Sequence, residues 1–190
     1  KFGRRDWRGG GRASARETTA RVLAGVVAKK LLASACGVET LAYVRQVGKF
    51  EASIDPLKVT LKQVEAHPVR CPDAKMAKKM EHLILAVRKQ GDTVGGVVEC
   101  VVKNVPAGLG DPVFDKLKAT LAHAMMSLPA TMGIEFGSGF GSLGLLGSQH
   151  NDPFVMQGKK IRTKTNHSGG IQGGISNGMP IIFRVVFKPV

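Results

Sequence analysis

Hydrophobic residues along this chain follow two different spacings, which separate predicted helices from predicted strands. Recurrence every three or four residues is typical of an amphipathic helix with one buried face. Alternation of apolar and polar residues is typical of a half-buried strand. The helical spacing covers residues 15–34, 74–90 and 113–127, and the strand pattern covers residues 38–50, 94–102, 132–136 and 180–189.

Capping residues support the starts of these helices. Ser14 and Glu17 predict a capping box, in which the serine oxygen accepts a backbone N–H of the first turn and the glutamate reaches back to the cap. Asp73 can cap the second helix in the same way. Asp111 followed by Pro112 predicts a cap with proline at the first helical position of the third helix.

The 190 residues predict one domain, because a chain of this length can bury about 70% of its unfolded surface without disulfides. Residues 51–72 contain three prolines and no sustained periodicity. We interpret them as a variable connection with a short helical piece near residues 57–66.

The net charge is strongly positive. It is +14, from 28 Lys and Arg against 14 Asp and Glu, so an anionic partner is expected. Nucleic acid is one such partner, but the basic residues are spread over the chain and aromatic residues make up only 5%. No RNA-recognition, zinc-finger or KH pattern is present. A small, multiply anionic substrate or a solvated basic surface explains the same excess.

The cysteine and histidine positions and the length of the apolar runs argue against three classes: disulfide-bonded, metal-binding and membrane-spanning proteins. Cys36, Cys71 and Cys100 are odd in number and far apart, which predicts free, mostly buried thiols in a reducing compartment. The histidines show no ligand spacing, so no metal site is expected. No apolar run approaches the roughly 20 residues that a membrane span needs.

Residues 8–17 join a glycine run to the first helix start and place arginines around the joint. Backbone N–H groups at a helix start favour anions, and glycines let a phosphate or carboxylate approach the main chain. Arg12 and Arg16 add forked donors for such an anion. A capped surface helix with solvated arginines explains the same residues, so both interpretations stay open on this pattern alone.

Two polar motifs lie farther along the chain. Residues 139–144 spell GxGxxG, but a dinucleotide fingerprint needs a helix that opens at the last glycines, and here a polar loop follows. His150, Asn151 and Asp152 offer a base, an amide and a carboxylate for acid-base or metal chemistry. A turn capped by Asn and Asp before proline is the favoured interpretation.

Residues 166–178 contain five glycines between a polar stretch and the last predicted strand. Ile171 and Ile175 lie between these glycines, which predicts that a sharply bending loop is also buried. Glycines separated by small polar residues let a flat ligand lie on the main chain.

Several long motifs in fixed order resemble chorismate synthases, from the Arg-Gly-Gly-Gly-Arg stretch at the start to a Phe-Lys-Pro segment at the end. The matching segments are residues 8–18, 28–30, 92–96, 108–117, 124–127, 148–152, 166–178 and 187–189. Residues 51–90 match weakly. The chain is similar to the central half of such an enzyme.

This resemblance implies an α+β fold, a β-α-β sandwich of helices packed between antiparallel sheets, in a homotetramer. It implies a lyase of the shikimate pathway that converts 5-enolpyruvylshikimate 3-phosphate into chorismate and phosphate, with reduced FMN and no net redox change. The location it implies is the cytoplasm, or a plastid in a photosynthetic eukaryote. It implies no membrane or nucleic-acid partner.

The resemblance also assigns binding roles. The FMN contacts it implies are Arg12, Ala13, Ser14, Pro129, Ala130, Gly173 and Lys188, and the substrate contacts are Ser14, Ala15 and Arg16. Two positions depart from the family pattern: Ala13 replaces a usual serine, and Val190 stands where threonine is expected.

No catalytic residue is assigned within residues 1–190. The family's catalytic histidines lie in motifs upstream of Lys1, and its essential arginine and aspartate lie beyond Val190. The 190 residues are therefore expected to be an incomplete central part of a single domain and to be inactive alone. Two alternatives stay open: a basic nucleic-acid-binding module, whose affinity falls steeply with salt, and a degenerate homologue without catalysis.

Overall fold

The computed structural model describes residues 3–4, 7–11 and 14–190. Within this part of the chain, five strands form an antiparallel sheet in the order β2-β1-β3-β9-β4. Their bounds are β1 (Glu39–Val47), β2 (Phe50–Glu51), β3 (Gly96–Lys103), β4 (Thr131–Phe136) and β9 (Ile181–Phe187). Two separate hairpins pair β5 (Phe154–Gln157) with β6 (Lys160–Thr163), and β7 (Ile171–Gln172) with β8 (Ile175–Ser176).

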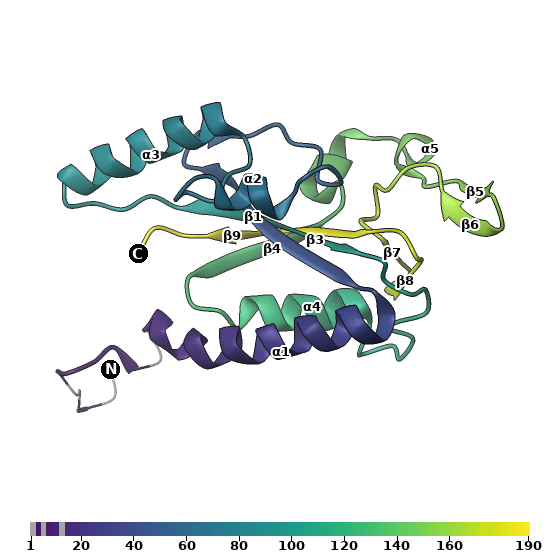
Figure 1. The fold of residues 1–190 in the computed structure, drawn as a ribbon, viewed down its shortest axis with the longest axis horizontal. Coiled ribbons are helices and arrows are strands. Elements are labelled where there is room, and N and C mark those ends of the chain that lie inside the picture. The colour runs from purple at the N-terminus through teal and green to yellow at the C-terminus, as the bar shows by residue number, and fades with distance from the viewer. Residues whose placement is uncertain (1–2, 5–6, 12–13) are drawn as a thin grey trace.

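Helices lie on both faces of the large sheet (Figure 1). One face carries α1 (Thr18–Cys36) and α4 (Leu117–Met126), and the other carries α2 (Leu61–Glu65) and α3 (Ala74–Lys89). The predicted strands and the short helix in the 51–72 connection are confirmed. Helices beside an antiparallel sheet make this an α+β fold, as expected.

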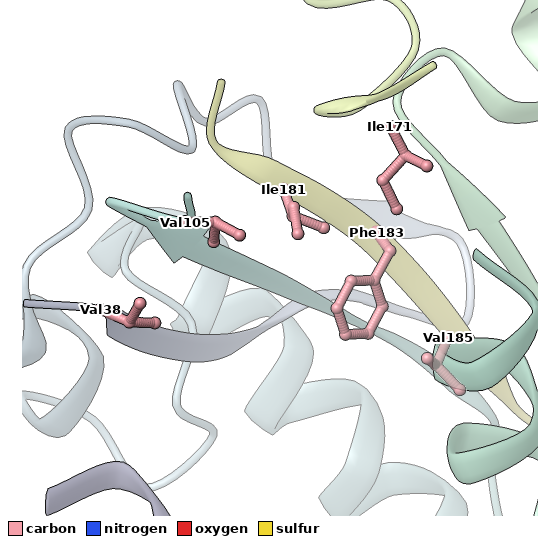
Figure 2. Packing of buried hydrophobic residues seen from close by; sticks show 6 residues of the cluster. All are labelled: Val38, Val105, Ile171, Ile181, Phe183 and Val185. Carbon is pink, nitrogen blue, oxygen red and sulfur yellow. The ribbon is translucent and has the colours of Figure 1, made fainter. Parts of the chain in front are cut away.

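The core between the sheet and α4 is built largely from β9 (Figure 2). Ile181, Phe183 and Val185 are each at most 4% exposed and alternate with less buried residues, so the predicted alternation is confirmed. Burying each such side chain contributes about 1.5–3 kcal/mol. Val38, Val105 and Ile171 complete the cluster.

The opposite face has its own core under α2 and α3. Met80 of α3 and Ala77 are fully buried, and Val64 of α2 is 3% exposed. Asp73 caps α3 as predicted, because its Oδ1 accepts hydrogen bonds from Lys75 N at 2.9 Å and Met76 N at 3.0 Å.

The expectation that α1 buries one face is wrong for the described residues. Val22, Leu23 and Val27 are 65%, 66% and 68% exposed. The helix is apolar around most of its circumference, and that composition is typical of a helix that is covered on several sides. In this structure, the other described residues cover only part of one side of α1.

The third helix begins later than predicted, at Leu117. The backbone N–H of Asp115 donates to the Pro112 carbonyl at 3.0 Å, so these residues form a separate turn. Leu117 N donates to Gly174 O at 2.8 Å, and this contact with the β7–β8 hairpin sets where α4 starts.

The GxGxxG pattern forms the 3₁₀ helix η3 (Gly139–Gly144), which follows an antiparallel strand. This context confirms that the pattern is not a dinucleotide fingerprint. The polar loop expected after it contains one helical turn, α5 (Gly147–His150).

Candidate functional site

The first group of predicted site residues lies where the chain enters α1. Ser14 precedes the 3₁₀ turn η2 (Ala15–Glu17), and its Oγ accepts a hydrogen bond from Arg16 N at 3.4 Å. The glutamate half of the predicted capping box is wrong. Ser14 N already donates to the glycine run at 3.0 Å, and Glu17 pairs with Arg21 at 3.6 Å.

Arg12 and Ala13 lie outside the described residues. Ala15 and Arg16 are exposed. The Arg16 guanidinium folds over the glycine run, since a Cβ added at Gly9 would lie 2.6 Å from Arg16 Nη2. The described part of this corner thus places a cationic group beside the start of a helix.

Pro129, Ala130 and Lys188 lie together near this corner. Lys188 N donates to Ala130 O at 3.0 Å, which extends the pairing of β9 with β4 by one bond. Ala130 has a φ of 65°, an uncommon backbone angle for a residue with a Cβ. Arg21 Nη1 donates to Ser127 Oγ at 2.7 Å and so ties the first turns of α1 to the end of α4.

Gly173 lies at the other end of α4. It forms the β7–β8 turn with Gly174, at φ angles of 61° and 92° that favour glycine. Gly174 O accepts the N–H of Leu117, the first residue of α4, whereas Pro129 follows the last. A helix of this length spans about 15 Å, and Figure 1 shows the hairpin far from the C-terminus. The structure does not bring Gly173 together with Lys188 within one chain.

A cleft of about 590 Å³ lies beside Gly173, between the N-terminal half of α4, strand β4 and the turns that follow it. The rings of His150 and His167 lie 5.6 Å apart, centroid to centroid. Lys118 Nζ lies 5.5 Å from the Phe136 ring centroid. Cationic and aromatic groups around open glycine backbone suit a flat, anionic ligand. The wall includes Lys118, Phe136, Phe140, His150, His167 and Gly173.

Asp152 is 2% exposed and does not line the cleft. Its Oδ1 accepts hydrogen bonds from Thr165 Oγ1 at 2.6 Å and His167 N at 2.8 Å, and its Oδ2 accepts one from Ser168 N at 2.8 Å. Burial alone would raise the pKa of Asp152, but these hydrogen bonds outweigh burial and lower it. The prediction that Asn and Asp cap their own turn before the proline is wrong, because Asp152 caps the backbone of a distant loop instead.

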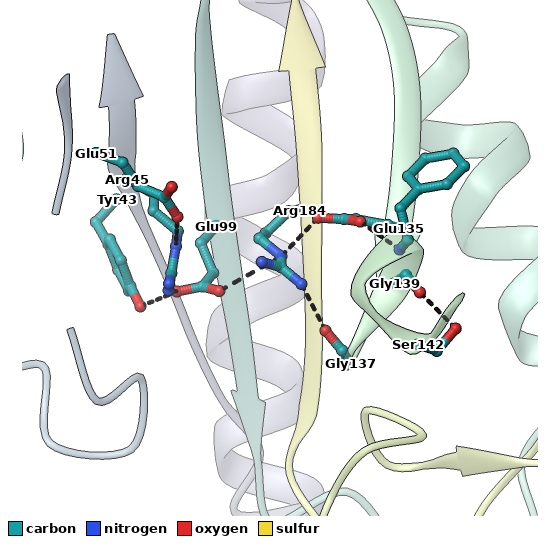
Figure 3. Close-up of polar contacts among 10 residues, drawn as sticks. Tyr43, Arg45, Glu51, Glu99, Glu135, Gly137, Gly139, Ser142 and Arg184 are labelled. Atoms are coloured by element: carbon teal, nitrogen blue, oxygen red, sulfur yellow. Dashed lines mark hydrogen bonds and ion pairs between the residues drawn. The ribbon is translucent and has the colours of Figure 1, made fainter. Parts of the chain in front are cut away.

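Sequence reasoning missed a row of charged and polar side chains that crosses the sheet from β1 to β4 (Figure 3). Glu99, 2% exposed, lies at its centre. Glu99 Oε2 accepts hydrogen bonds from the Tyr43 hydroxyl and, at 2.8 Å, from Arg45 Nη1. Burial and the Glu99 carboxylate raise the pKa of Tyr43, so Tyr43 stays a donor. Burial alone would lower the pKa of Arg45, but the Glu99 charge raises it.

Arg184 continues this row to the cleft. Its Nε lies 3.0 Å from Glu135 Oε1, and its Nη2 donates to Gly137 O at 2.6 Å. Glu135 Oε2 accepts the N–H of Phe140 at 2.9 Å, so the row fixes part of the cleft wall. The sequence contains a signal for this row. Glu99 and Arg184 have opposite charges and each lies within an apolar strand, a pattern that favours a buried ion pair.

Other chemistry is limited in the part of the chain that the structure describes. Among these residues, no group of His, Cys, Asp or Glu side chains is arranged to hold a metal ion. No helix in the same part is long and apolar enough to cross a membrane. Cys36, Cys71 and Cys100 are free thiols; Cys71 is buried, whereas Cys36 is exposed.

Comparison with known proteins identifies the family. The family model for chorismate synthase matches residues 1–190, so this chain belongs to the chorismate synthase family. Over its whole length the chain is 59% identical to the chorismate synthase of Synechocystis sp. (strain ATCC 27184 / PCC 6803 / Kazusa), of which it covers 52%. It is 60% identical to that of Synechococcus sp. (strain JA-3-3Ab), of which it covers 50%.

A solved structure agrees with the family assignment. A crystal structure of chorismate synthase superposes with a TM-score of 0.83 at 36% identity, over 94% of this chain and 57% of that chain. The chain spans about half the length of the curated relatives it matches.

Proposed function

We propose that the complete protein is a lyase that converts 5-enolpyruvylshikimate 3-phosphate into chorismate and phosphate, with reduced FMN as cofactor. The observation that carries this proposal is the family match over all 190 residues. When bound, reduced FMN supplies transient electron donation that assists loss of the phosphate and a ring hydrogen without net redox change. The residues of this chain bind and orient the ligands.

The residues where α1 begins fit a phosphorylated, acidic ligand. Arg16 and Lys188 are exposed cations, and the positive end of the helix dipole favours anions at the start of α1. The long 3.4 Å cap bond of Ser14 leaves its hydroxyl available for a second partner. The FMN contacts we propose are Arg12, Ala13, Ser14, Pro129, Ala130, Gly173 and Lys188, and the substrate contacts are Ser14, Ala15 and Arg16.

The distance between Gly173 and Lys188 supports a shared site. A helix of about 15 Å lies between the two positions within one chain. FMN is an elongated molecule of comparable length, so we infer that Gly173 and Lys188 contact different parts of it; the homotetramer that the family resemblance implies stays a proposal.

The exposed apolar side chains of α1 support placing residues 1–190 within a larger domain. Val22, Leu23 and Val27 are each at least 65% exposed, and the chain spans about half of its relatives. We infer that further parts of the complete protein cover this helix, as the second sheet of a β-α-β sandwich.

An anaerobic assay tests this proposal. The complete protein, mixed with reduced FMN and 5-enolpyruvylshikimate 3-phosphate, should produce the ultraviolet absorbance of chorismate, whereas the 190-residue chain should not. No product from the complete protein, together with binding to single-stranded DNA that weakens steeply with salt, would favour the nucleic-acid alternative.

Paired lysine variants test the cofactor contact. Lys188→Met should raise the Kd for FMN, because a charge-assisted contact to an anion is lost. Lys159→Met removes an exposed lysine of the β5–β6 turn and should leave that Kd unchanged. Equal effects of the two variants would count against the assignment of Lys188.

A further inference from the structure

The cleft beside Gly173 is shaped by a group that does not touch it. The Asp152 carboxylate is buried behind the wall and accepts three hydrogen bonds from Thr165, His167 and Ser168, at 2.6, 2.8 and 2.8 Å. His167 and Ser168 line the cleft. One carboxylate therefore fixes the backbone of two wall residues, His167 and Ser168.

His167 is the residue most completely fixed by this arrangement. Its N–H donates to Asp152, and its carbonyl oxygen accepts the N–H of Ser138 at 2.8 Å. Its Nδ1 lies 3.1 Å from Ser138 Oγ, and among the described residues the other ring nitrogen, Nε2, has no hydrogen-bond partner. The imidazole stacks at a tilt of 31° beside His150, two residues before Asp152.

The same loop continues into the glycine-rich turn. Asn166 Nδ2 donates to Pro180 O at 2.8 Å, and Asn166 Oδ1 accepts the N–H of Gly170 at 2.7 Å. The Asp152 carboxylate therefore holds the backbone at His167 and Ser168, and the Asn166 side chain holds Gly170 and Pro180, immediately before the chain reaches Ile171 and Gly173. A shift at Asp152 would act directly on His167 and Ser168, and these two residues lead into the glycine-rich turn.

We propose that Asp152 is a positioning residue, which holds the His167 imidazole and the following loop in place to receive FMN in the cleft. This inference rests on the proposed function, because the ligand is the cofactor assigned there. A partner behind the residues that hold a ligand limits their motion and so strengthens binding without touching the ligand.

Asp152→Asn in the complete protein tests the proposal. The substitution replaces one carboxylate oxygen, which accepts hydrogen bonds, with an amide N–H₂ group, which then faces a backbone N–H donor. Asp73→Asn is the matched control, because Asp73 also accepts two backbone N–H groups, at 2.9 and 3.0 Å, but caps α3 on the opposite face of the sheet. Binding of oxidised FMN is followed by fluorescence quenching, and amide hydrogen exchange is followed for His167 and Ser168.

Asp152→Asn should speed amide exchange at His167 and Ser168 and raise the Kd for FMN by about tenfold. This is the lower end of the range of losses seen when a residue that supports a binding residue from behind is mutated. Asp73→Asn should change neither measurement. If Asp152→Asn does not fold, Thr165→Val removes one of the three bonds, and Thr165→Ser keeps it. Thr165→Val should then weaken FMN binding more than Thr165→Ser.

The outcomes separate the two proposals. No quenching of FMN by the unsubstituted protein would overturn the proposed function and this inference with it. Normal quenching by that protein, with an equal Kd in the Asp152→Asn and Asp73→Asn variants, would overturn the inference alone. Faster loop exchange in Asp152→Asn with an unchanged Kd would also overturn it, because the loop would then be stabilised without serving the ligand.

Discussion

Glu99 offers a direct test of how the sheet is held together. Its side chain is 3% exposed and accepts hydrogen bonds from Tyr43 and Arg45. Glu51 pairs with the same guanidinium at 3.1 Å, but its side chain is 51% exposed. Glu99→Gln and Glu51→Gln therefore each remove one negative charge beside Arg45. Glu99 is buried, accepts the Tyr43 hydrogen bond and lies 3.9 Å from Arg184 Nε, whereas Glu51 is exposed and pairs with Arg45.

Burial sets the expected magnitude. Breaking a buried ion pair by removing one partner costs about 3–5 kcal/mol, because the remaining charge is left uncompensated. An exposed pair contributes about 0–1 kcal/mol. Glu99→Gln keeps the side-chain shape, so we expect the lower figure, about 3 kcal/mol. In the complete protein the fall in Tm for Glu99→Gln should therefore be about three times, or more, the fall for Glu51→Gln.

Thermal unfolding followed by circular dichroism measures both variants. The effect of Glu51→Gln should shrink in high salt, because exposed charges are screened, whereas the effect of Glu99→Gln should persist. Equal falls in Tm, or a Glu99→Gln effect that salt abolishes, would refute the view that a buried charge network supports the sheet.

Three further predictions follow from single side chains. Because the folded pKa of Asp152 is lowered, its contribution to stability is full above the unfolded pKa of about 3.9 and is lost as pH falls through the folded pKa. The difference in unfolding free energy between the unsubstituted protein and Asp152→Asn should therefore narrow below about pH 4 in urea titrations. Cys36 is exposed and should react with iodoacetamide at about pH 8. Cys71 is buried, which raises its pKa, so it should react only after denaturation. Equal labelling of the two cysteines in the folded protein, measured by mass spectrometry, would contradict this prediction. Gly137→Ala places a Cβ against the His167 carbonyl and the Gly169 N–H at a φ of 56°, so it should cost more than the about 1–3 kcal/mol of backbone strain alone. Gly141→Ala meets no atom within 4 Å and should lower Tm far less.

Much of the fold follows from local sequence. Alternation in residues 180–189 predicted β9, and Asp73 marked the start of α3, because both signals depend on neighbours along the chain. The start of α4 could not be predicted, since it depends on the contact between Leu117 and Gly174. The exposure of α1 could not be predicted either, because an apolar helix pattern does not say which surface covers it.

The candidate site was only partly predictable. The glycine-rich loop and the arginine corner stood out by composition, but their placement at opposite ends of α4 depends on tertiary structure. Asp152 was found as a polar residue, whereas its partners Thr165, His167 and Ser168 lie too far along the chain for a local pattern to connect them. Glu99 and Arg184 were missed although each carries a charge into an apolar strand.

The place of β9 in the sheet has a consequence for synthesis of the protein. Among the described strands, β4 pairs with β9 alone, and β9 is the last of them to be made. Chains grow at about 5–20 residues per second, so α4 and β4 leave the ribosome several seconds before their sheet partner. During that interval the apolar side of β4 has no sheet to join. Residues 131–136 therefore stay unpaired until residues 181–187 emerge and complete the sheet.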